Sequence, residues 1–143
     1  MTALPTPFNV MIAHAGHSPW AEGLARSLAP LPLELHRPKT ADQTFDLAAT
    51  RRMHVAVVDD DLPDAGGRGV VRRMRGAGLH LPCLLVCRMP DQRVLQDAMQ
   101  LDVFTVVEAD AQGELLPPVV LKLVRRIYRV EWTIPGGFDQ ANN

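Results

Sequence analysis

Apolar residues follow two patterns along this chain. Short uninterrupted runs predict buried strands, and longer segments with apolar residues at every third or fourth position predict helices with one buried face. The clearest run is Val55 to Val58, which has no polar interruption, as expected of a strand buried on both faces of a parallel sheet. Further strands are predicted over residues 8–13, 33–37, 82–87 and 103–107.

Helices are predicted between and after these strands. Ser18 followed by Pro19 is typical of a helix start, and this helix should end before Pro30. Thr40 and Gln43 form a capping-box pattern that predicts a second helix. That helix covers 41–52, the third carries Val70, Val71 and Met74 and ends at Gly76 to Gly78, the fourth starts at Pro90, and the fifth runs from Pro117 to Trp132.

Five strands alternating with five helices predict an α/β fold with a parallel sheet covered on both faces. The common order for this size is 2-1-3-4-5, the flavodoxin-like arrangement. It places the first and third strands side by side, so we expect His14 and Asp59 to face each other across the sheet edge where ligands gather. We predict one domain over residues 8–132, a flexible lead-in over 1–7 and a disordered tail over 133–143.

Composition narrows the range of partners. Fifteen basic residues against sixteen acidic residues leave a net charge of -1, so the total charge does not favour nucleic-acid binding. No apolar run approaches the ~20 residues of a membrane span, and the first ten residues lack the features of a signal peptide. We therefore expect a cytoplasmic protein without a nucleic-acid or membrane partner. Cys83 and Cys87 lie four residues apart in one predicted strand, too far for a disulfide.

A motif follows the strand at residues 55–58. Asp59 comes directly after it, Pro63 lies four residues later and Gly67 eight residues later. In spacing and residue type this motif resembles the receiver domain of bacterial two-component response regulators, and the resemblance extends over residues 8–130. It implies that Asp59 occupies the phosphoacceptor position, whereas Asp60 and Asp61 do not.

The resemblance also implies that the other parts of the phosphorylation site are replaced. Working receivers also have two metal-binding acids, a hydroxyl residue, a switch aromatic and a lysine. In that order, these positions align here with His14, Ala15, Cys87, Thr105 and Glu108. A one-residue shift would place Phe104 at the aromatic position. Phosphoryl transfer depends on a magnesium ion and a cation that neutralise developing charge, and magnesium needs carboxylate ligands. We therefore predict a pseudo-receiver without a magnesium site, another cofactor or enzymatic activity, which signals through protein contact.

Several alternatives remain open for the residues near Asp59. Asp59 could still accept a phosphoryl group, or it could be a carboxylate that caps a loop or pairs with His14. His14, His17, Asp59 and Cys87 could form a transition-metal site, because imidazole and thiolate suit zinc or copper. A flavodoxin-like enzyme or cofactor binder is a further alternative, although no glycine-rich phosphate loop follows the first strand.

The acidic cluster after the third strand requires compensation, since three adjacent carboxylates repel one another. Arg88 either neutralises this cluster or lies in solvent. We predict that His14 or Arg88 holds Asp59, with no metal ion bound to it.

The last predicted helix is the candidate contact surface. Its basic residues form one stripe and its apolar residues form another, and a few large side chains widen the apolar stripe. These side chains indicate either a second contact surface or ordinary exposure. We predict self-association or binding of a partner protein through the face made by the fourth helix, the fifth strand and the fifth helix. The basic stripe is Lys122, Arg125, Arg126 and Arg129, and the widening residues are Leu121, Tyr128 and Trp132.

Overall fold

The computed structural model describes residues 7–110 and 113–134. Within them the chain forms a five-stranded parallel sheet in the order β2-β1-β3-β4-β5, which confirms the predicted flavodoxin-like topology. The strands are β1 (Asn9–Ala13), β2 (Glu34–His36), β3 (Val55–Asp59), β4 (Cys83–Cys87) and β5 (Thr105–Glu108).

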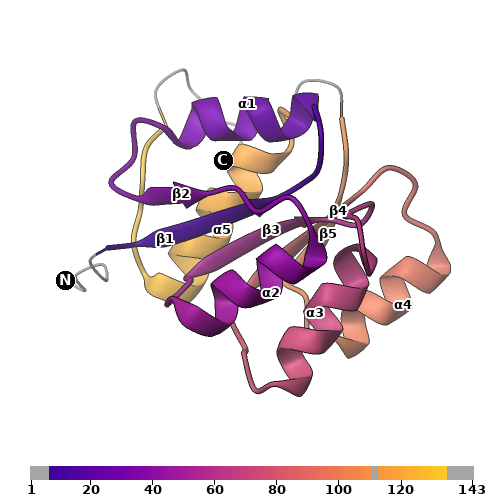
Figure 1. The fold of residues 1–143 in the computed structure, drawn as a ribbon. Helices are drawn as coiled ribbons and strands as arrows, with labels where there is room; N and C mark the ends of the chain where they lie inside the picture. The colour runs from indigo at the N-terminus through magenta and orange to yellow at the C-terminus, as the bar shows by residue number, and fades with distance from the viewer. Residues whose placement is uncertain (1–6, 111–112, 135–143) are drawn as a thin grey trace.

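A helix follows each strand: α1 (Pro19–Leu28), α2 (Ala41–Thr50), α3 (Gly66–Gly76), α4 (Gln92–Gln100) and α5 (Leu116–Tyr128). Helices α1 and α5 cover one face of the sheet, whereas α2, α3 and α4 cover the other (Figure 1). Within the described ranges, no helix is long and apolar enough to cross a membrane.

The central strand β3 shows why a continuous apolar run was needed. Val55 and Val57 belong to the core under α1 and α5, while Ala56 and Val58 belong to the core under α2 and α3. All four side chains are fully buried. Because helices cover both faces, neither side of this strand can carry a polar residue until it reaches the sheet edge at Asp59.

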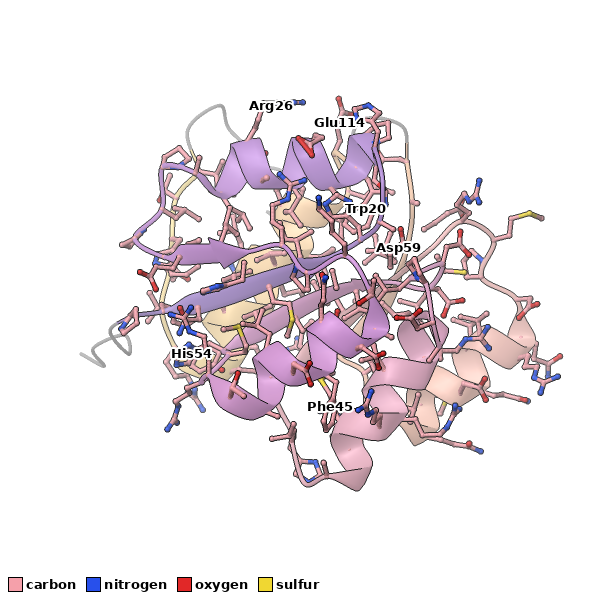
Figure 2. All side chains as sticks on the ribbon, viewed as in Figure 1. Trp20, Arg26, Phe45, His54, Asp59 and Glu114 are labelled. Atoms are coloured by element: carbon pink, nitrogen blue, oxygen red, sulfur yellow. The ribbon has the colours of Figure 1, made fainter. Side chains whose placement is uncertain are left out.

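The strand register brings the chemical groups of the motif to one edge. Ala13 pairs with Val58, so β1 and β3 end side by side, and Asp59 pairs with Val86 of β4. Asp59 therefore lies where these strands emerge, and His54 lies at the opposite end of β3 (Figure 2). This arrangement confirms that the first and third strands are neighbours.

The end of α5 differs from the prediction. The helix stops at Tyr128 because Arg129 adopts a left-handed conformation with φ 61°, so Trp132 lies beyond the helix. The following segment packs back onto the core, where Ile134 is 2% exposed. The prediction of disorder from residue 133 is therefore wrong for Ile134. The rest of the predicted tail, residues 135–143, and residues 1–6 of the lead-in lie outside the described residues.

Two helix starts show how well local signals predict boundaries. Thr40 accepts a hydrogen bond from the Gln43 backbone N–H at 3.0 Å, as the capping-box pattern indicated. The helix α4 starts later than predicted, because the carboxylate of Asp91 caps it by accepting the Val94 N–H at 2.9 Å. Asp91 is the residue after the predicted start, Pro90.

Candidate functional site

Pro63 and Gly67 shape the loop that follows β3. The Pro63 carbonyl accepts the N–H of Ala41, the first residue of α2, at 3.0 Å. A Cβ added at Gly67 would lie 2.7 Å from the Asp59 carbonyl oxygen and 2.9 Å from Leu85 Cδ1. Because real Cβ atoms do not approach backbone so closely, only glycine allows the first turn of α3 to pack against the end of β3.

Asp59 ends β3 with a partly buried carboxylate. Its Oδ1 accepts the backbone N–H of Asp61 at 2.9 Å. Burial is the main cause that raises the pKa of Asp59; the Asp61 N–H opposes this effect, and the carboxylates of Asp61 and Asp60 add to it. Within the described residues neither His14 nor Arg88 forms a hydrogen bond or ion pair with Asp59, so the prediction that one of them holds it is wrong.

The two following aspartates find separate cations. Asp60 pairs with Nε of Arg68 at 3.0 Å, and Arg68 also reaches Asp97 at 2.8 Å. Asp61 pairs with Arg88 at 3.1 Å in an exposed ion pair. Arg88 therefore does neutralise part of the acidic cluster, but through Asp61 and not through Asp59.

His14 is engaged away from Asp59. Its ring is 6% exposed, and its Nε2 lies 2.9 Å from Nη2 of Arg37, which also pairs with Glu22. Because a guanidinium can only donate, Nε2 of His14 is the acceptor and the ring is neutral. Burial, followed by the charge of Arg37, lowers the pKa of His14, which agrees with this protonation state. The ends of β1 and β3 are adjacent, as expected, but the side chain of His14 binds Arg37 and not Asp59.

A pocket of about 390 Å³ opens beside Asp59. Asp59, Asp61 and Asp110 bring three carboxylates to it, against the guanidinium of Arg88. Asp110 was not predicted as a site residue, although its place just after β5 puts it at the same carboxyl edge of the sheet. The start of α1 and the end of β5 supply the rest of the lining: Ala15, His17, Ser18, Pro19, Trp20 and Ala109.

The other positions of the motif also differ from the residues that the resemblance implies. Cys87 is 8% exposed and packs with Leu85 and Val94 under α4, on the other face of β4 from Val86, the partner of Asp59. Burial raises the pKa of the Cys87 thiol. Thr105 and Glu108 are exposed at the two ends of β5. At the position of the expected lysine, Glu108 thus carries the opposite charge.

The residues of the transition-metal alternative are not brought together. His17 and Asp59 line the same pocket, but His14 is bound to Arg37 and Cys87 lies under α4. Throughout residues 7–110 and 113–134, no three His, Cys, Asp or Glu side chains are grouped to hold a metal ion. At the two positions aligned with the metal-binding acids, Ala15 has no donor atom and Nε2 of His14 already accepts from Arg37, so neither supplies the carboxylate that magnesium favours.

Of the three residues predicted to widen the apolar stripe of α5, Leu121 is buried, and Tyr128 and Trp132 are half-buried against the core. Leu121 is 6% exposed, and the hydroxyl of Tyr128 donates to the His54 carbonyl at 2.7 Å. Tyr128 and Trp132 both meet the ring of Phe8 edge-on, with centroids 5.2 Å and 5.1 Å away. The interpretation of these residues as a contact surface is therefore wrong for Leu121, whereas Tyr128 and Trp132 pack beside Phe8 and stay partly exposed.

Other side chains are exposed on the predicted contact face. Leu95 and Met99 of α4 are 47% and 81% exposed, and Ile127 of α5 is 43% exposed. The basic stripe of α5 is exposed as predicted and surrounds a shallow hollow. These residues define what we call the α4–α5 face: Leu95, Met99, Lys122, Arg125, Arg126, Ile127 and Arg129.

No protein-family model and no curated protein matches this chain in sequence. Solved structures do match in three dimensions. The signal receiver domain of an HD domain-containing protein from Pseudomonas fluorescens is 19% identical with a TM-score of 0.71, over 86% of this chain and 98% of that one. The receiver domain of a Francisella response regulator is 14% identical with a TM-score of 0.72, over 82% and 97%. The signal receiver domain of a histidine kinase from Syntrophus aciditrophicus is 16% identical with a TM-score of 0.71, over 90% and 98%. The chain therefore has the fold of the signal receiver domains of two-component systems.

Proposed function

We propose that this chain is a receiver-type signalling domain that works without phosphorylation and acts by binding a partner protein or a second copy of itself. On this proposal it is not an enzyme, binds no magnesium ion and works in the cytoplasm. The receiver fold and the motif of Asp59, Pro63 and Gly67 support the signalling role. The replaced residues around Asp59 support the loss of phosphorylation.

The observation that carries the proposal is the bond between His14 and Arg37. His14 stands where the resemblance places a metal-binding acid, and its Nε2 is occupied at 2.9 Å by a permanent cation. Glu22 holds that cation in turn. A magnesium ion at this place would have to displace a guanidinium and accept an imidazole in place of a carboxylate, which magnesium does not favour.

The charges that line the pocket beside Asp59 also support the loss of phosphorylation. A phosphoryl group on Asp59 would add negative charge beside Asp61 and Asp110, and the lysine that should neutralise it is replaced by Glu108. Arg88 remains as a cation in the lining, but Asp61 already binds it. Since electrostatic stabilisation supplies most of the catalysis in phosphoryl transfer, this pocket lacks the means to accelerate it.

The residues of the α4–α5 face indicate the chemistry of the partner that would bind there. Leu95 and Met99 lie one helical turn apart and offer apolar area, while the basic stripe of α5 offers four cations. Apolar residues at the centre and charges at the rim are the usual composition of a protein interface. The partner should therefore present apolar side chains flanked by carboxylates.

The test is a phosphorylation assay read by intact-mass spectrometry. Acetyl phosphate and magnesium are added to this protein and, in parallel, to a working receiver domain as a positive control. We expect no phosphate adduct on this protein. An adduct that disappears in Asp59→Asn would instead support the alternative of a phosphorylatable receiver.

A second experiment addresses the contact surface. Leu95→Ser with Met99→Ser should lower the apparent mass in sedimentation, or weaken capture of the partner, whereas Met89→Ser alters a residue that is 84% exposed elsewhere and serves as the control. If the wild type is monomeric at high concentration and the double variant still captures every partner, the α4–α5 face has no such role.

A further inference from the structure

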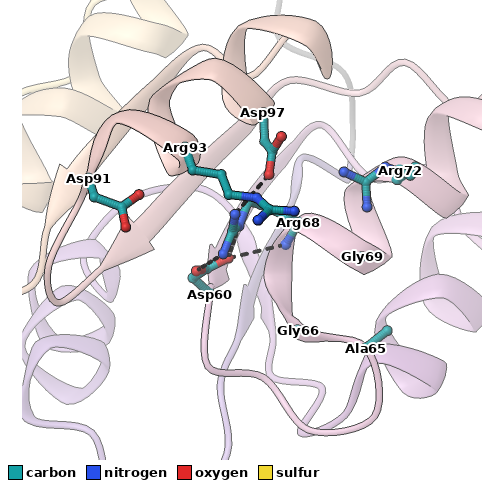
Figure 3. Close-up of a pocket in the computed structure, with 9 residues that line it drawn as sticks. All are labelled: Asp60, Ala65, Gly66, Arg68, Gly69, Arg72, Asp91, Arg93 and Asp97. Atoms are coloured by element: carbon teal, nitrogen blue, oxygen red, sulfur yellow. Dashed lines mark hydrogen bonds and ion pairs between the residues drawn. The ribbon is translucent and has the colours of Figure 1, made fainter.

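A second cavity lies between α3 and α4, away from the pocket beside Asp59. It measures about 430 Å³, within the size range of small-ligand sites. The two pockets share no lining residue. Figure 3 shows this α3–α4 cleft, with Arg68 and Arg72 on α3 and Arg93 and Asp97 on α4.

Each aspartate of the cleft accepts at least one hydrogen bond. Both oxygens of Asp60 bind the guanidinium of Arg68, and Asp97 binds its third nitrogen at 2.8 Å. Asp91 uses its Oδ1 to cap α4 through the Val94 N–H. The acidic residues therefore bind Arg68 and cap α4, and none of them forms a hydrogen bond or ion pair with the other two arginines of the cleft.

Two guanidiniums in the cleft have no such partner. Arg72 and Arg93 form no side-chain hydrogen bond or ion pair with any residue in the described part of the chain, and both are exposed. In Figure 3 the side chain of Arg93 extends from α4 toward the first turn of α3. Since Arg68 lies between the two helices as well, three guanidiniums border one cavity, and the three aspartates of its lining form no ion pair with two of them.

The floor of the cleft leaves room for a ligand. On the α3 side, Ala65, Gly66 and Gly69 contribute nothing larger than a methyl group. The lining has no aromatic or large aliphatic side chain, so a nucleobase or an apolar group would find nothing to stack on. A suitable ligand is therefore compact and multiply charged.

We propose that the α3–α4 cleft binds a compact phosphate-bearing small anion, of the pyrophosphate type, through Arg72 and Arg93. Guanidiniums pair with phosphate in bidentate geometry, and a diphosphate presents oxygens in enough directions to meet a cation on each helix. Bound there, the anion links α3 to α4, the helices that Arg68 already joins through Asp60 and Asp97. Because α4 carries Leu95 and Met99, this binding stabilises the element that presents the α4–α5 face. The site does not depend on the loss of phosphorylation at Asp59.

The test titrates the full chain with sodium pyrophosphate and follows the backbone amides by two-dimensional NMR. We expect saturable shifts of the Gly66 and Gly69 amides, which resonate apart from most others, and at least tenfold weaker binding in Arg72→Gln with Arg93→Gln. Both residues are exposed, so the variant should fold, and its melting temperature checks this.

A matched control distinguishes a specific site from a general attraction of pyrophosphate to positive charge. Arg26→Gln with Arg51→Gln removes the same charge from exposed positions outside the cleft and should leave pyrophosphate affinity within twofold of the wild type. Orthophosphate and a phosphoserine peptide are titrated in parallel; tighter binding of the peptide would identify a protein ligand and overturn the small-anion assignment. Equal affinity in the Arg72/Arg93 variant and the wild type, equal loss in the control, or no saturation at millimolar pyrophosphate would also overturn it.

Discussion

The two ends of β3 differ in the kind of polar group that they bury. At the carboxyl end, the Asp59 carboxylate is partly buried and receives one backbone N–H, and its pKa is raised by burial. At the amino end, Nδ1 of His54 accepts the Asn9 N–H at 2.9 Å and its carbonyl accepts the Tyr128 hydroxyl at 2.7 Å. The amino end buries a neutral imidazole, whose Nε2 has no hydrogen-bond partner among the described residues, whereas the carboxyl end keeps a partly buried carboxylate.

Aromatic packing completes the amino end. The Phe8 ring stacks on His54 with centroids 4.7 Å apart and meets Tyr128 and Trp132 edge-on. Asn9 joins three strands here, because its side chain also binds the Arg52 carbonyl and His36. This difference within one strand teaches how the two ends are held: aromatic packing and hydrogen bonds hold a neutral ring at the amino end, whereas the carboxyl end keeps a charge, as functional sites tend to do.

The largest expected effect comes from Phe8→Ala, which removes the ring at the centre of the amino end. Phe8 is 2% exposed, and deleting a buried Phe costs about 3–5 kcal/mol of unfolding free energy. Phe45→Ala, at a partly exposed ring on α2, should cost clearly less. Urea unfolding measures both, and equal losses would contradict the special role of the amino end.

At the carboxyl end, Gly67→Ala should destabilise the chain by about 1–3 kcal/mol, because its Cβ would overlap the Asp59 carbonyl. Gly76 lies in the same helix, has no atom within 4 Å of an added Cβ and does not adopt a left-handed φ. Gly76→Ala should therefore be neutral or stabilising by up to about 1 kcal/mol. Thermal unfolding of the pair checks the steric argument, which fails if the two variants behave alike.

Acid should weaken the histidine networks first. The pKa of His54, His36 and His14 is lowered from 6.5, in each case chiefly by burial. A lowered folded-state pKa means that the unfolded chain binds more protons, so the contribution to stability is present above pH 6.5 and is lost as the pH falls. We expect the urea midpoint to drop between pH 7.5 and 5.5. A midpoint that stays flat or rises over this range would contradict neutral, buried imidazoles.

Asp59→Asn should have a smaller and opposite effect. The pKa of Asp59 is raised above 3.8, so its contribution to stability is present at acid pH and is lost as the pH rises through the folded-state value. Removing the charge should therefore stabilise the chain at pH 7 by about 0.5 kcal/mol or more. Asp61→Asn, which loses the ion pair with Arg88, should bring no such gain. If Asp59→Asn is the less stable of the two, Asp59 is better compensated than the contacts indicate.

Much of the fold could be predicted from the sequence because the signals are local. Uninterrupted apolar runs such as 55–58 identify strands buried on both faces, and the alternation of strands with helices restricts the topology to few choices. The position of Asp59 relative to Pro63 and Gly67 was equally local. The structure gives these residues physical roles in joining the loop to α2 and α3.

The partners of the site residues could not be predicted in the same way. Arg37 reaches His14 from the segment after β2, and Arg68 reaches Asp60 from α3, and no spacing rule identifies which of many arginines will do so. The end of α5 was misjudged because the apolar pattern continues through Trp132, although a left-handed residue at Arg129 breaks the helix. The direction of Cys87 could have been derived, since neighbouring residues in a strand point to opposite faces and Asp59 pairs with Val86.

The most direct test of the proposed loss of phosphorylation is a titration with beryllofluoride and magnesium, which together imitate a phosphoryl group on an aspartate. Because this adduct needs the magnesium ligands and a cation as well as the carboxylate, it reports the whole site at once. We predict no saturable change of the Asp59, Asp61 and Arg88 amides by NMR. Saturable shifts of these amides that vanish in Asp59→Asn would show a working acceptor site and contradict the central claim.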